Sequence, residues 1–226
     1  MTGLARQKEE FSPENSSVTP GITPVLTTAR LILRQPRLSD FEHWAAYFAS
    51  DRSVHEGGPL DRIAAWKHWA ADVALWTLKG YGPFGVEDRM TGAYLGEVGI
   101  YHGEGYPAPE LGWFVVPDAE GKGVAREAAQ AVLTWVRMTF DWPHITNIIE
   151  PANTRSIALG LRLGGVIDAT LPGIDPWDVV IRHELRGGHE LRDAVGDPDP
   201  DDHPPDLART ARDGFPLHAR LQRQPA

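Results

Sequence analysis

The sequence predicts a mixed α/β fold in one domain, and two observations carry this prediction. Segments with the apolar period of strands alternate with segments that have the period of helices between residues 24 and 186. The 226 residues, 42% of them hydrophobic, are enough to bury one core with some length to spare. We therefore expect a single folded domain over 24–186, with strands and helices in alternation.

The first half of this region predicts a strand, two helices and a strand pair. "ARLILRQP" (29–36) has the composition of a strand, and "LSDFEHWAAYFA" (38–49) follows as a helix with Ser39 and Glu42 at capping-box spacing. A second helix is predicted because four large apolar residues fall on one helical face: Trp66, Trp69, Val73 and Trp76. "GPFGVED" and "AYLGEVGIYH" then predict two strands that pair around a turn at 89–92.

The second half predicts three strands and two helices. "PELGWFVV" (109–116) and "ITNIIE" (145–150) are expected strands, and "DVVIRHEL" (178–185) is the last one. Between the first two lies a helix whose apolar stripe has helical spacing: Val124, Ala125, Ala128, Ala129, Val132, Leu133 and Val136. "ANTRSIALGLRL" predicts a further helix, which Gly164 and Gly165 end.

Both ends of the chain differ in composition from the predicted domain. Residues 1–23 are rich in Ser, Glu, Pro and Thr, and we expect a disordered leader there. Residues 187–226 contain "DPDPDDHPPD", in which prolines and aspartates prevent a lasting helix or central strand, so we expect a disordered acidic tail. The acidic side chains of that run are the right type for a cation, but without a rigid scaffold they preorganise no metal site, so no metal is predicted.

Charge and composition exclude several classes of protein. The net charge of −9 argues against nucleic acids or anionic membranes as partners. The absence of cysteine excludes disulfides, thiolate metal sites and a cysteine nucleophile. The chain has neither a signal-peptide apolar region at its start nor eighteen consecutive apolar residues, so we expect a cytoplasmic protein.

The stretch "PDAEGKGVAREAAQ" (117–130) is the strongest local signal for a ligand. A strand that ends at Val116 and a helix that begins near Gly123 direct free backbone N–H groups and the positive end of a helix dipole at the loop between them. Gly121 and Gly123 carry no Cβ that would keep a phosphate away, and Lys122 adds charge. Glycines before a helix also simply make turns, and the spacing matches neither a Walker A loop nor a dinucleotide loop.

The segments around this loop favour a phosphate site over a simple turn. "TTARLILRQPRLSDF", "GYGPFGVED", "GEVGI", "PELGWFVVPDAEGKGVAREA" and "NTRSIALGLRLGGV" follow one another in an order that resembles the GCN5-related N-acetyltransferase (GNAT) family, and in particular its ribosomal-protein alanine acetyltransferase branch. The resemblance covers 24–186. It implies a central, bent, mostly antiparallel sheet with two neighbouring strands splayed apart, flanked by helices, and acetyl-CoA as cosubstrate with its pantetheine arm in the gap.

The resemblance also implies which residues hold acetyl-CoA. The pantetheine would lie along the backbone of Phe114, Val115 and Val116, and the amide of Asn153 would bond its amide groups. The pyrophosphate would be held by the backbone N–H groups of the loop: Gly121, Lys122, Gly123, Val124 and Ala125. The family has Gln or Arg at the start of this loop, whereas this chain has Glu120, which puts the affinity for the cofactor in doubt.

Acetyl transfer to an amine needs a neutral nitrogen, so a general base is useful. Glu110 is the first candidate, because strand alternation puts it on one face with Gly112 and Phe114; a structural hydrogen bond is an equally good interpretation. Glu97 is a second candidate base. A backbone N–H near Phe114 can meet the developing oxyanion without any side chain.

The resemblance also bears on the proton for the leaving thiolate. Many family members supply it from a tyrosine seven positions after the Asn, where this chain has Gly160. Ser156 is the available hydroxyl in that helix, as in the alanine acetyltransferase branch, although a serine in a first helical turn is an equally good interpretation. His102 is a candidate for facing the acceptor, against the commoner role of a hydrogen-bonded or surface histidine.

Three functions follow as hypotheses. The first is an N-acetyltransferase that moves an acetyl group from acetyl-CoA to a small amine or a peptide N-terminus by direct attack in a ternary complex; a homodimer stays open. The second is an acyl-CoA-binding sensor or assembly module without turnover. The third is a nucleotide-binding protein of another α/β fold, which would need a parallel sheet, and the antiparallel pair around 89–92 argues against it.

Overall fold

The computed structural model describes Phe11 and residues 22–185. Its strands form one sheet in the order β1-β2-β3-β4-β5-β6-β8-β7. The strands are β1 Leu26–Thr27, β2 Leu31–Arg34, β3 Pro83–Asp88, β4 Tyr94–Tyr101, β5 Glu110–Val115, β6 His144–Ile149, β7 Val166–Ile167 and β8 Val179–Glu184. All neighbours are antiparallel except β5 and β6. The mixed, mostly antiparallel sheet confirms the predicted fold class and excludes the parallel alternative.

Four α-helices flank the sheet in the described part of the chain. They are α2 Phe41–Phe48, α3 Arg62–Lys79, α4 Val124–Thr139 and α5 Thr154–Arg162, with short 3-10 turns at η2 Leu38–Asp40, η3 Asp51–Glu56 and η4 Pro117–Ala119. The apolar stripe of α4 packs into the main core with Leu159 and Leu163 at α5. Helices α2 and α3 form a second cluster with Phe114 of β5. Helix α3 thus contributes to both clusters, with Ala65 and Trp69 in the second and Trp76 in the main core.

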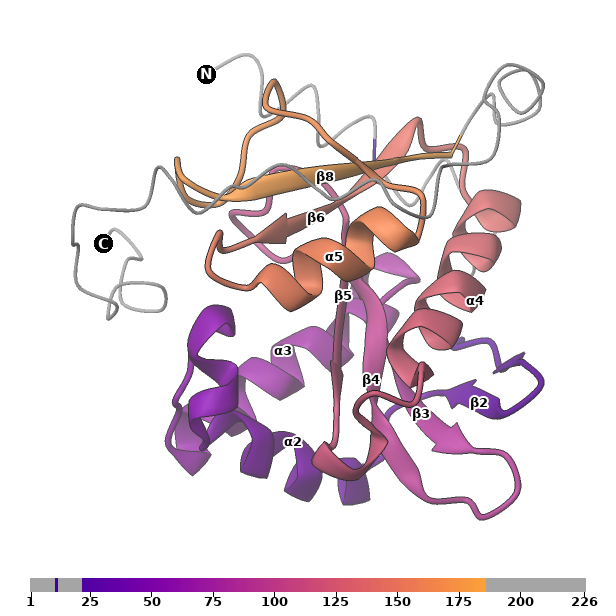
Figure 1. Cartoon of the computed structure of the whole chain (residues 1–226). Coiled ribbons are helices and arrows are strands. Elements are labelled where there is room, and N and C mark those ends of the chain that lie inside the picture. Colours follow the sequence, from indigo (N-terminus) through magenta and orange to yellow (C-terminus); the bar gives the residue numbers. More distant parts are fainter. Residues whose placement is uncertain (1–10, 12–21, 186–226) are drawn as a thin grey trace. The chain divides into compact units, whose positions relative to one another are not determined.

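The sheet is strongly bent (Figure 1). Strands β4 and β5 run along one direction, while β6 and β8 cross the top of the view at a steep angle, with α5 in front of them (Figure 1). Helix α4 lies beside β3 and β4, and its N-terminus points toward the end of β5 (Figure 1). The bend therefore falls between β5 and β6, where the resemblance implies splayed strands.

The start of α2 differs from the prediction. Ser39 and Glu42 form no capping box; instead η2 precedes the helix, and the Asp40 carboxylate accepts a hydrogen bond from the Arg37 backbone N–H at 2.7 Å. Asp40 is buried and paired with the guanidinium of Arg34. Its burial with a cationic partner outweighs the local capping pattern, because an unpaired buried carboxylate is costly.

Phe11 is the one residue before Ile22 that the structure describes. Its ring is 2% exposed and packs edge-on against Trp142, His144 and His102. The leader predicted over 1–23 thus contains one side chain that belongs to the main core. The tail predicted over 187–226 lies outside the described residues. Among those described, no helix is both long and apolar enough to cross a membrane.

Candidate active site

The splay between β5 and β6 is visible in their hydrogen bonds. Their residues pair at a single position, Glu110 opposite Thr146. Just beyond it, two side chains replace the backbone ladder: the Glu110 carboxylate accepts from the Ile148 N–H at 3.2 Å, and the Asn147 amide donates to the Leu111 carbonyl. These bonds end the pairing in a defined way, and the strands diverge after them.

Asn147 has a structural role here for which the sequence carries no signal. Its side-chain oxygen lies 2.7 Å from Nε2 of His183 on β8, which fixes the amide so that its nitrogen faces β5. Burial, with a smaller contribution from Arg137, lowers the pKa of His183 to about 4, so this imidazole is neutral at pH 7. Two buried polar side chains from two strands therefore hold the point at which the sheet opens.

The glycine loop has the geometry of an anion site. Gly121 and Gly123 adopt φ of 69° and 76°, a region that residues with a Cβ rarely adopt. Gly123 is also the N-cap of α4, with no side chain satisfying the first helical N–H groups. Among the described residues, the backbone N–H groups from Gly121 to Ala125 have no hydrogen-bond acceptor. The five predicted loop residues thus present free donors at a helix N-terminus.

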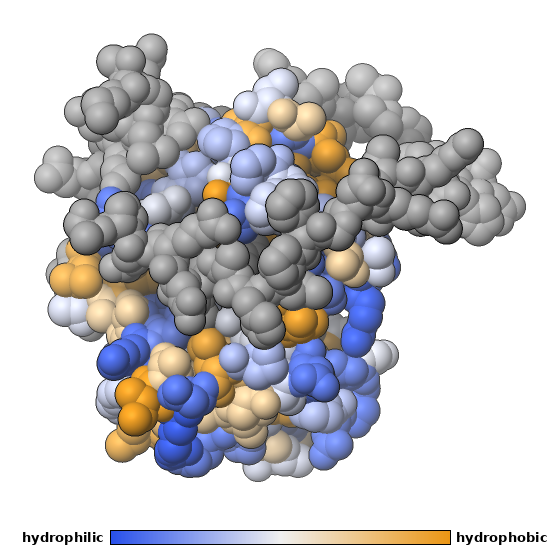
Figure 2. Space-filling model, turned by 90° about the vertical axis from the view of Figure 1, so that its left-hand side faces the viewer, coloured by the Kyte–Doolittle hydropathy of each residue, from blue (hydrophilic) through white to orange (hydrophobic). Residues whose placement is uncertain are grey.

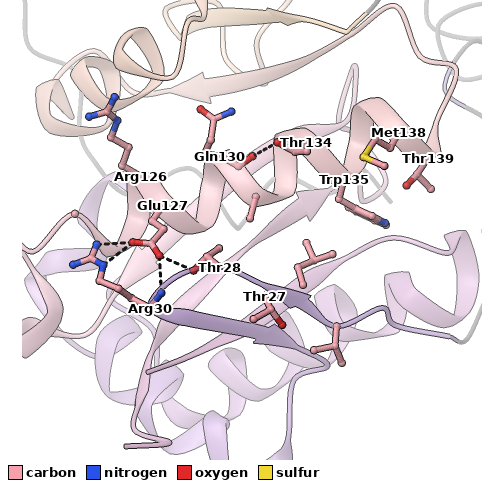
Figure 3. Close-up of a pocket in the computed structure, with 14 residues that line it drawn as sticks. Thr27, Thr28, Arg30, Arg126, Glu127, Gln130, Thr134, Trp135, Met138 and Thr139 are labelled. Atoms are coloured by element: carbon pink, nitrogen blue, oxygen red, sulfur yellow. Dashed lines mark hydrogen bonds and ion pairs between the residues drawn. The ribbon is translucent and has the colours of Figure 1, made fainter. Parts of the chain in front are cut away.

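Arg30, the residue before β2, contacts this loop. Its guanidinium donates to the Lys122 carbonyl at 3.1 Å and to the Glu127 carboxylate at 2.7 Å, and Thr28 donates to the same carboxylate at 2.6 Å. A groove of about 990 Å³ continues from Gly123 along the outer side of α4 (Figure 3). It is bounded by α4 and the β1–β2 segment, so it adjoins the loop but is separate from the β5–β6 gap.

Glu120 is not an isolated carboxylate beside a phosphate site. It forms ion pairs with Arg52 of η3 and, at 3.3 Å, with Arg155 of α5, and Arg52 also donates to the Val115 carbonyl at 3.0 Å. Burial alone would raise the pKa of Glu120, but the two arginines outweigh it and lower the pKa. Two arginines, from η3 and from α5, therefore pair with this one carboxylate.

Asn153 and Ser156 both lie at the N-terminus of α5. The Asn153 side-chain oxygen accepts from the Ser156 backbone N–H at 3.2 Å, so Asn153 is the N-cap of the helix. Its amide nitrogen and the Ser156 hydroxyl have no hydrogen-bond partner among the described residues. Gly160 leaves no room for a tyrosine, because a Cβ there would lie 2.8 Å from Ile181 and 2.9 Å from the Asn147 side chain.

The opposite face of β4 and β5 carries the candidate bases. Glu97 on β4 is 0% exposed, and Tyr101 donates to it at 3.0 Å. Burial raises the pKa of Glu97 to about 7, against the smaller effects of Tyr101 and of the indoles of Trp69 and Trp44, which lower it. Glu110 is half-buried at the start of β5. Both carboxyls thus lie on the face of β4 and β5 that carries Phe114.

Other residues singled out from the sequence lie in the packing of the domain. His102 is buried, and its Nδ1 lies 2.9 Å from the Tyr81 hydroxyl, so the hydrogen-bonded interpretation holds. The predicted tryptophan stripe is confirmed, with Trp69 and Trp76 buried and Trp66 44% exposed. The ring of Trp66 packs edge-on against Phe41 of α2.

Comparison with known proteins agrees with this geometry. Residues 30–166 match the acetyltransferase (GNAT) domain family. The chain is 27% identical over 68% of its length to "Uncharacterized N-acetyltransferase YnaD" of Bacillus subtilis, covering 92% of that protein. It resembles the crystal structure of an acetyltransferase from Agrobacterium tumefaciens at 36% identity with a TM-score of 0.70, over 74% of this chain and 97% of the other.

A ribosomal L7/L12 alpha-N-protein acetyltransferase, RimL, solved in complex with coenzyme A, shares the fold at 14% identity with a TM-score of 0.55, over 70% of this chain and 95% of that one. The family match extends over more than half of the chain and includes the splayed strands, the glycine loop and the start of α5. This chain belongs to the GNAT acetyltransferase family.

Proposed function

We propose that this protein transfers an acetyl group from acetyl-CoA to a primary amine by direct attack in a ternary complex. One observation carries the proposal: the opening of the sheet after Glu110 and Thr146 lies next to a helix N-terminus with unsatisfied N–H groups. A thioester with a phosphate-bearing tail fits such a combination, because the N–H groups bind phosphate and the open strand edge binds an extended chain.

The residues present fit acetyl-CoA. The backbone N–H groups of Gly121, Lys122, Gly123, Val124 and Ala125 would hold the pyrophosphate, with the charges of Arg155 and Lys122 nearby. The pantetheine would lie along Phe114, Val115 and Val116, and the free amide nitrogen of Asn153 would donate to it from α5. When bound, acetyl-CoA supplies an activated acyl group with a thiol leaving group.

Glu110 is our proposed general base, and it acts directly or through a water. Its carboxylate is half-buried where β5 and β6 part, and one oxygen is held by the Ile148 N–H. That bond orients the carboxylate, and we propose that the carboxylate accepts the proton from the amine. Glu97 is the second candidate.

Ser156 is our proposed donor of the proton to the leaving thiolate. Its hydroxyl lies in the first turn of α5, beside Asn153, and is not engaged by another described residue. A thiol with a pKa of about 8.5 leaves reasonably well without help, so the contribution of this serine is modest. A backbone N–H of β5 near Phe114 would meet the developing negative charge on the acyl oxygen.

The alternative is an acyl-CoA-binding module without turnover. The packing around Gly160 favours it, since no side chain can replace the family's tyrosine there. Measuring free CoA thiol with a panel of amines and N-terminal peptides separates the two functions. Amine-dependent thiol release supports the transferase, and tight acetyl-CoA binding without release over the whole panel supports the module.

A further inference from the structure

The short helix η3 bridges the open ends of β5 and β6. On one side, the Arg52 guanidinium donates to the carbonyl of Val115, the last residue of β5, at 3.0 Å. On the other side, His55 Nδ1 lies 2.9 Å from the carboxylate of Glu150, the residue after β6. Arg52 and His55 are three positions apart, which puts them on one face of a 3-10 helix. One short segment between α2 and α3 therefore contacts both strands where they diverge.

The Val115 carbonyl is an acceptor that faces into the gap. The N–H of Val116 belongs to the same peptide unit, and it donates to the Leu95 carbonyl of β4 at 2.9 Å. The C=O and N–H of a trans peptide unit point in opposite directions, so the Val115 carbonyl points away from β4 and toward β6. An extended ligand that adds to the edge of β5 needs such acceptors. Arg52 therefore holds a hydrogen-bonding position on the proposed path of the pantetheine.

Other contacts of η3 hold it to α2 and do not cross the gap. The Ser50 side chain caps its first turn, and Gly57, with a φ of 86°, ends it. The hydroxyl of Ser53 donates to the Phe48 carbonyl at the end of α2 at 3.2 Å, and the Tyr47 hydroxyl of the same helix lies 3.3 Å from the Arg52 carbonyl. The attachment of η3 to α2 thus does not depend on the contacts that Arg52 and His55 make with the two strands.

The contacts across the gap are of a kind that a ligand can replace. The side chains of Arg52 and Glu120, which form an ion pair, are 32% and 30% exposed, and those of His55 and Glu150 are 29% and 24% exposed. Ion pairs that water reaches in this way contribute little to stability. Figure 2 shows the molecule from the side on which α2 and α3 lie, and hydrophilic residues are interspersed with hydrophobic ones on the surface visible there. Accessible polar contacts therefore hold η3 across the gap.

We infer that η3 is a strap over the cofactor gap, and that acetyl-CoA binds by displacing Arg52 from the Val115 carbonyl. The inference rests on the proposed function, since it describes how the cofactor of that site enters. Release of Arg52 leaves the carbonyl free to accept a hydrogen bond from a pantetheine amide. The measured affinity for the cofactor is then reduced by the fraction of molecules in which the strap is closed. Because η3 joins α2 to α3, cofactor binding also frees the segment that connects these two helices.

The test replaces Arg52 with methionine, which keeps an unbranched side chain and removes the guanidinium. The probe is S-acetylpantetheine, which has the arm of acetyl-CoA without its phosphates, so loss of a nearby positive charge does not itself weaken binding. In calorimetric titration, Arg52→Met should bind the probe about 10 to 100-fold more tightly, because a hydrogen bond from a charged group no longer holds the strap closed.

Arg62→Met is the matched control. The Arg62 guanidinium lies 5.0 Å from the centre of an aromatic ring, as that of Arg52 does at 5.1 Å, and each pairs with a glutamate. The partner of Arg62 is Glu42 of α2 rather than a residue at the gap, so this variant should bind S-acetylpantetheine as the parent does.

Hydrogen exchange in the parent protein tests the release directly. Saturation with acetyl-CoA should speed exchange of the backbone N–H groups of residues 50–58, because η3 is then held on the α2 side alone. The same addition should slow exchange at residues 121–125, where the phosphates bind. If the cofactor enters without moving the strap, exchange at 50–58 stays the same or slows.

The outcomes separate this inference from the proposed function. Weaker or unchanged binding of the probe by a folded Arg52→Met, or exchange at 50–58 that acetyl-CoA does not speed, overturns the inference even if amines are acetylated. Tighter binding by Arg52→Met together with faster exchange supports it even if no acetyl group is transferred. A parent protein that binds neither ligand contradicts both. If Arg52→Met shows no cooperative thermal unfolding, the exchange result in the parent protein decides.

Discussion

Replacing Gly123 with valine tests the anion loop, because its effect on folding stability can be separated from its effect on acetyl-CoA binding. Gly123 has a φ of 76°, and a Cβ there would meet only Arg30 at 3.5 Å, so backbone strain rather than crowding opposes the substitution. A residue other than glycine in this region costs about 1–2 kcal/mol. In a domain of this size the loss lowers the melting temperature by about 2–8 °C.

The loss of ligand binding should be larger. Each N–H bond to a charged phosphate is worth about 1.5–3 kcal/mol, so losing one of them weakens acetyl-CoA about 10 to 100-fold. At a concentration 100 times the parent dissociation constant, the ligand stabilises the parent by about 2.7 kcal/mol. A variant that binds 100-fold more weakly gains only about 0.4 kcal/mol under those conditions. Its thermal shift should therefore fall from about 5–11 °C to about 1–2 °C.

Gly92→Val is the matched control. Gly92 has a φ of 72°, no atom lies within 4 Å of the position its Cβ would take, and it belongs to the β3–β4 turn. Because Gly92 makes no contact with residues 121–125, it should lose similar stability and keep the full acetyl-CoA shift. A Gly123→Val protein that keeps the shift, or a Gly92→Val protein that loses it, would refute the assignment of the phosphates to this loop.

Three further substitutions give distinct expected results. Ser156→Ala should lower kcat by about 10 to 100-fold with acetyl-CoA affinity unchanged, and steady-state kinetics that show the reverse would make Ser156 a cofactor contact instead. Glu97→Gln should increase the free energy of unfolding more at pH 8 than at pH 5, by up to about 3 kcal/mol in urea unfolding. The pKa of the Glu97 carboxyl rises from 4.5 to about 7 on folding, so its ionisation destabilises the folded parent as pH rises through that window, and glutamine removes this cost. An effect of the substitution that is the same at both pH values would contradict the burial of Glu97 as an acid. Glu120→Gln should tighten acetyl-CoA binding a few-fold at low salt, since it frees two arginines and removes one repulsive charge, and weaker binding in titrations would show that the carboxylate positions Arg155.

Local patterns in the sequence predicted most of the fold. The stripe of α4 and the glycines before it were predictable because helical periodicity and loop conformation depend on near neighbours. The two-residue strands β1 and β7 were missed because they are too short to show alternation. The capping box at Ser39 failed because a buried pair with Arg34 decides the position of Asp40.

The site was less predictable because its key contacts join distant residues. Glu120 was interpreted from its loop alone, whereas its partner Arg52 lies 68 positions earlier. Asn147 donates to the carbonyl of Leu111, 36 positions earlier, where β5 and β6 diverge. No local sequence pattern predicts this contact.

The most direct test of acetyl transfer is the amine-dependent release of CoA thiol from acetyl-CoA, with the acetylated amine quantified in the same reaction. We expect release that is proportional to enzyme, saturates with the amine, and matches the acetylated product one to one. Glu110→Gln should slow it more below neutral pH than above, because high pH supplies the neutral amine without a base. Saturable binding of acetyl-CoA without amine-dependent release for any small amine or peptide N-terminus would contradict the account.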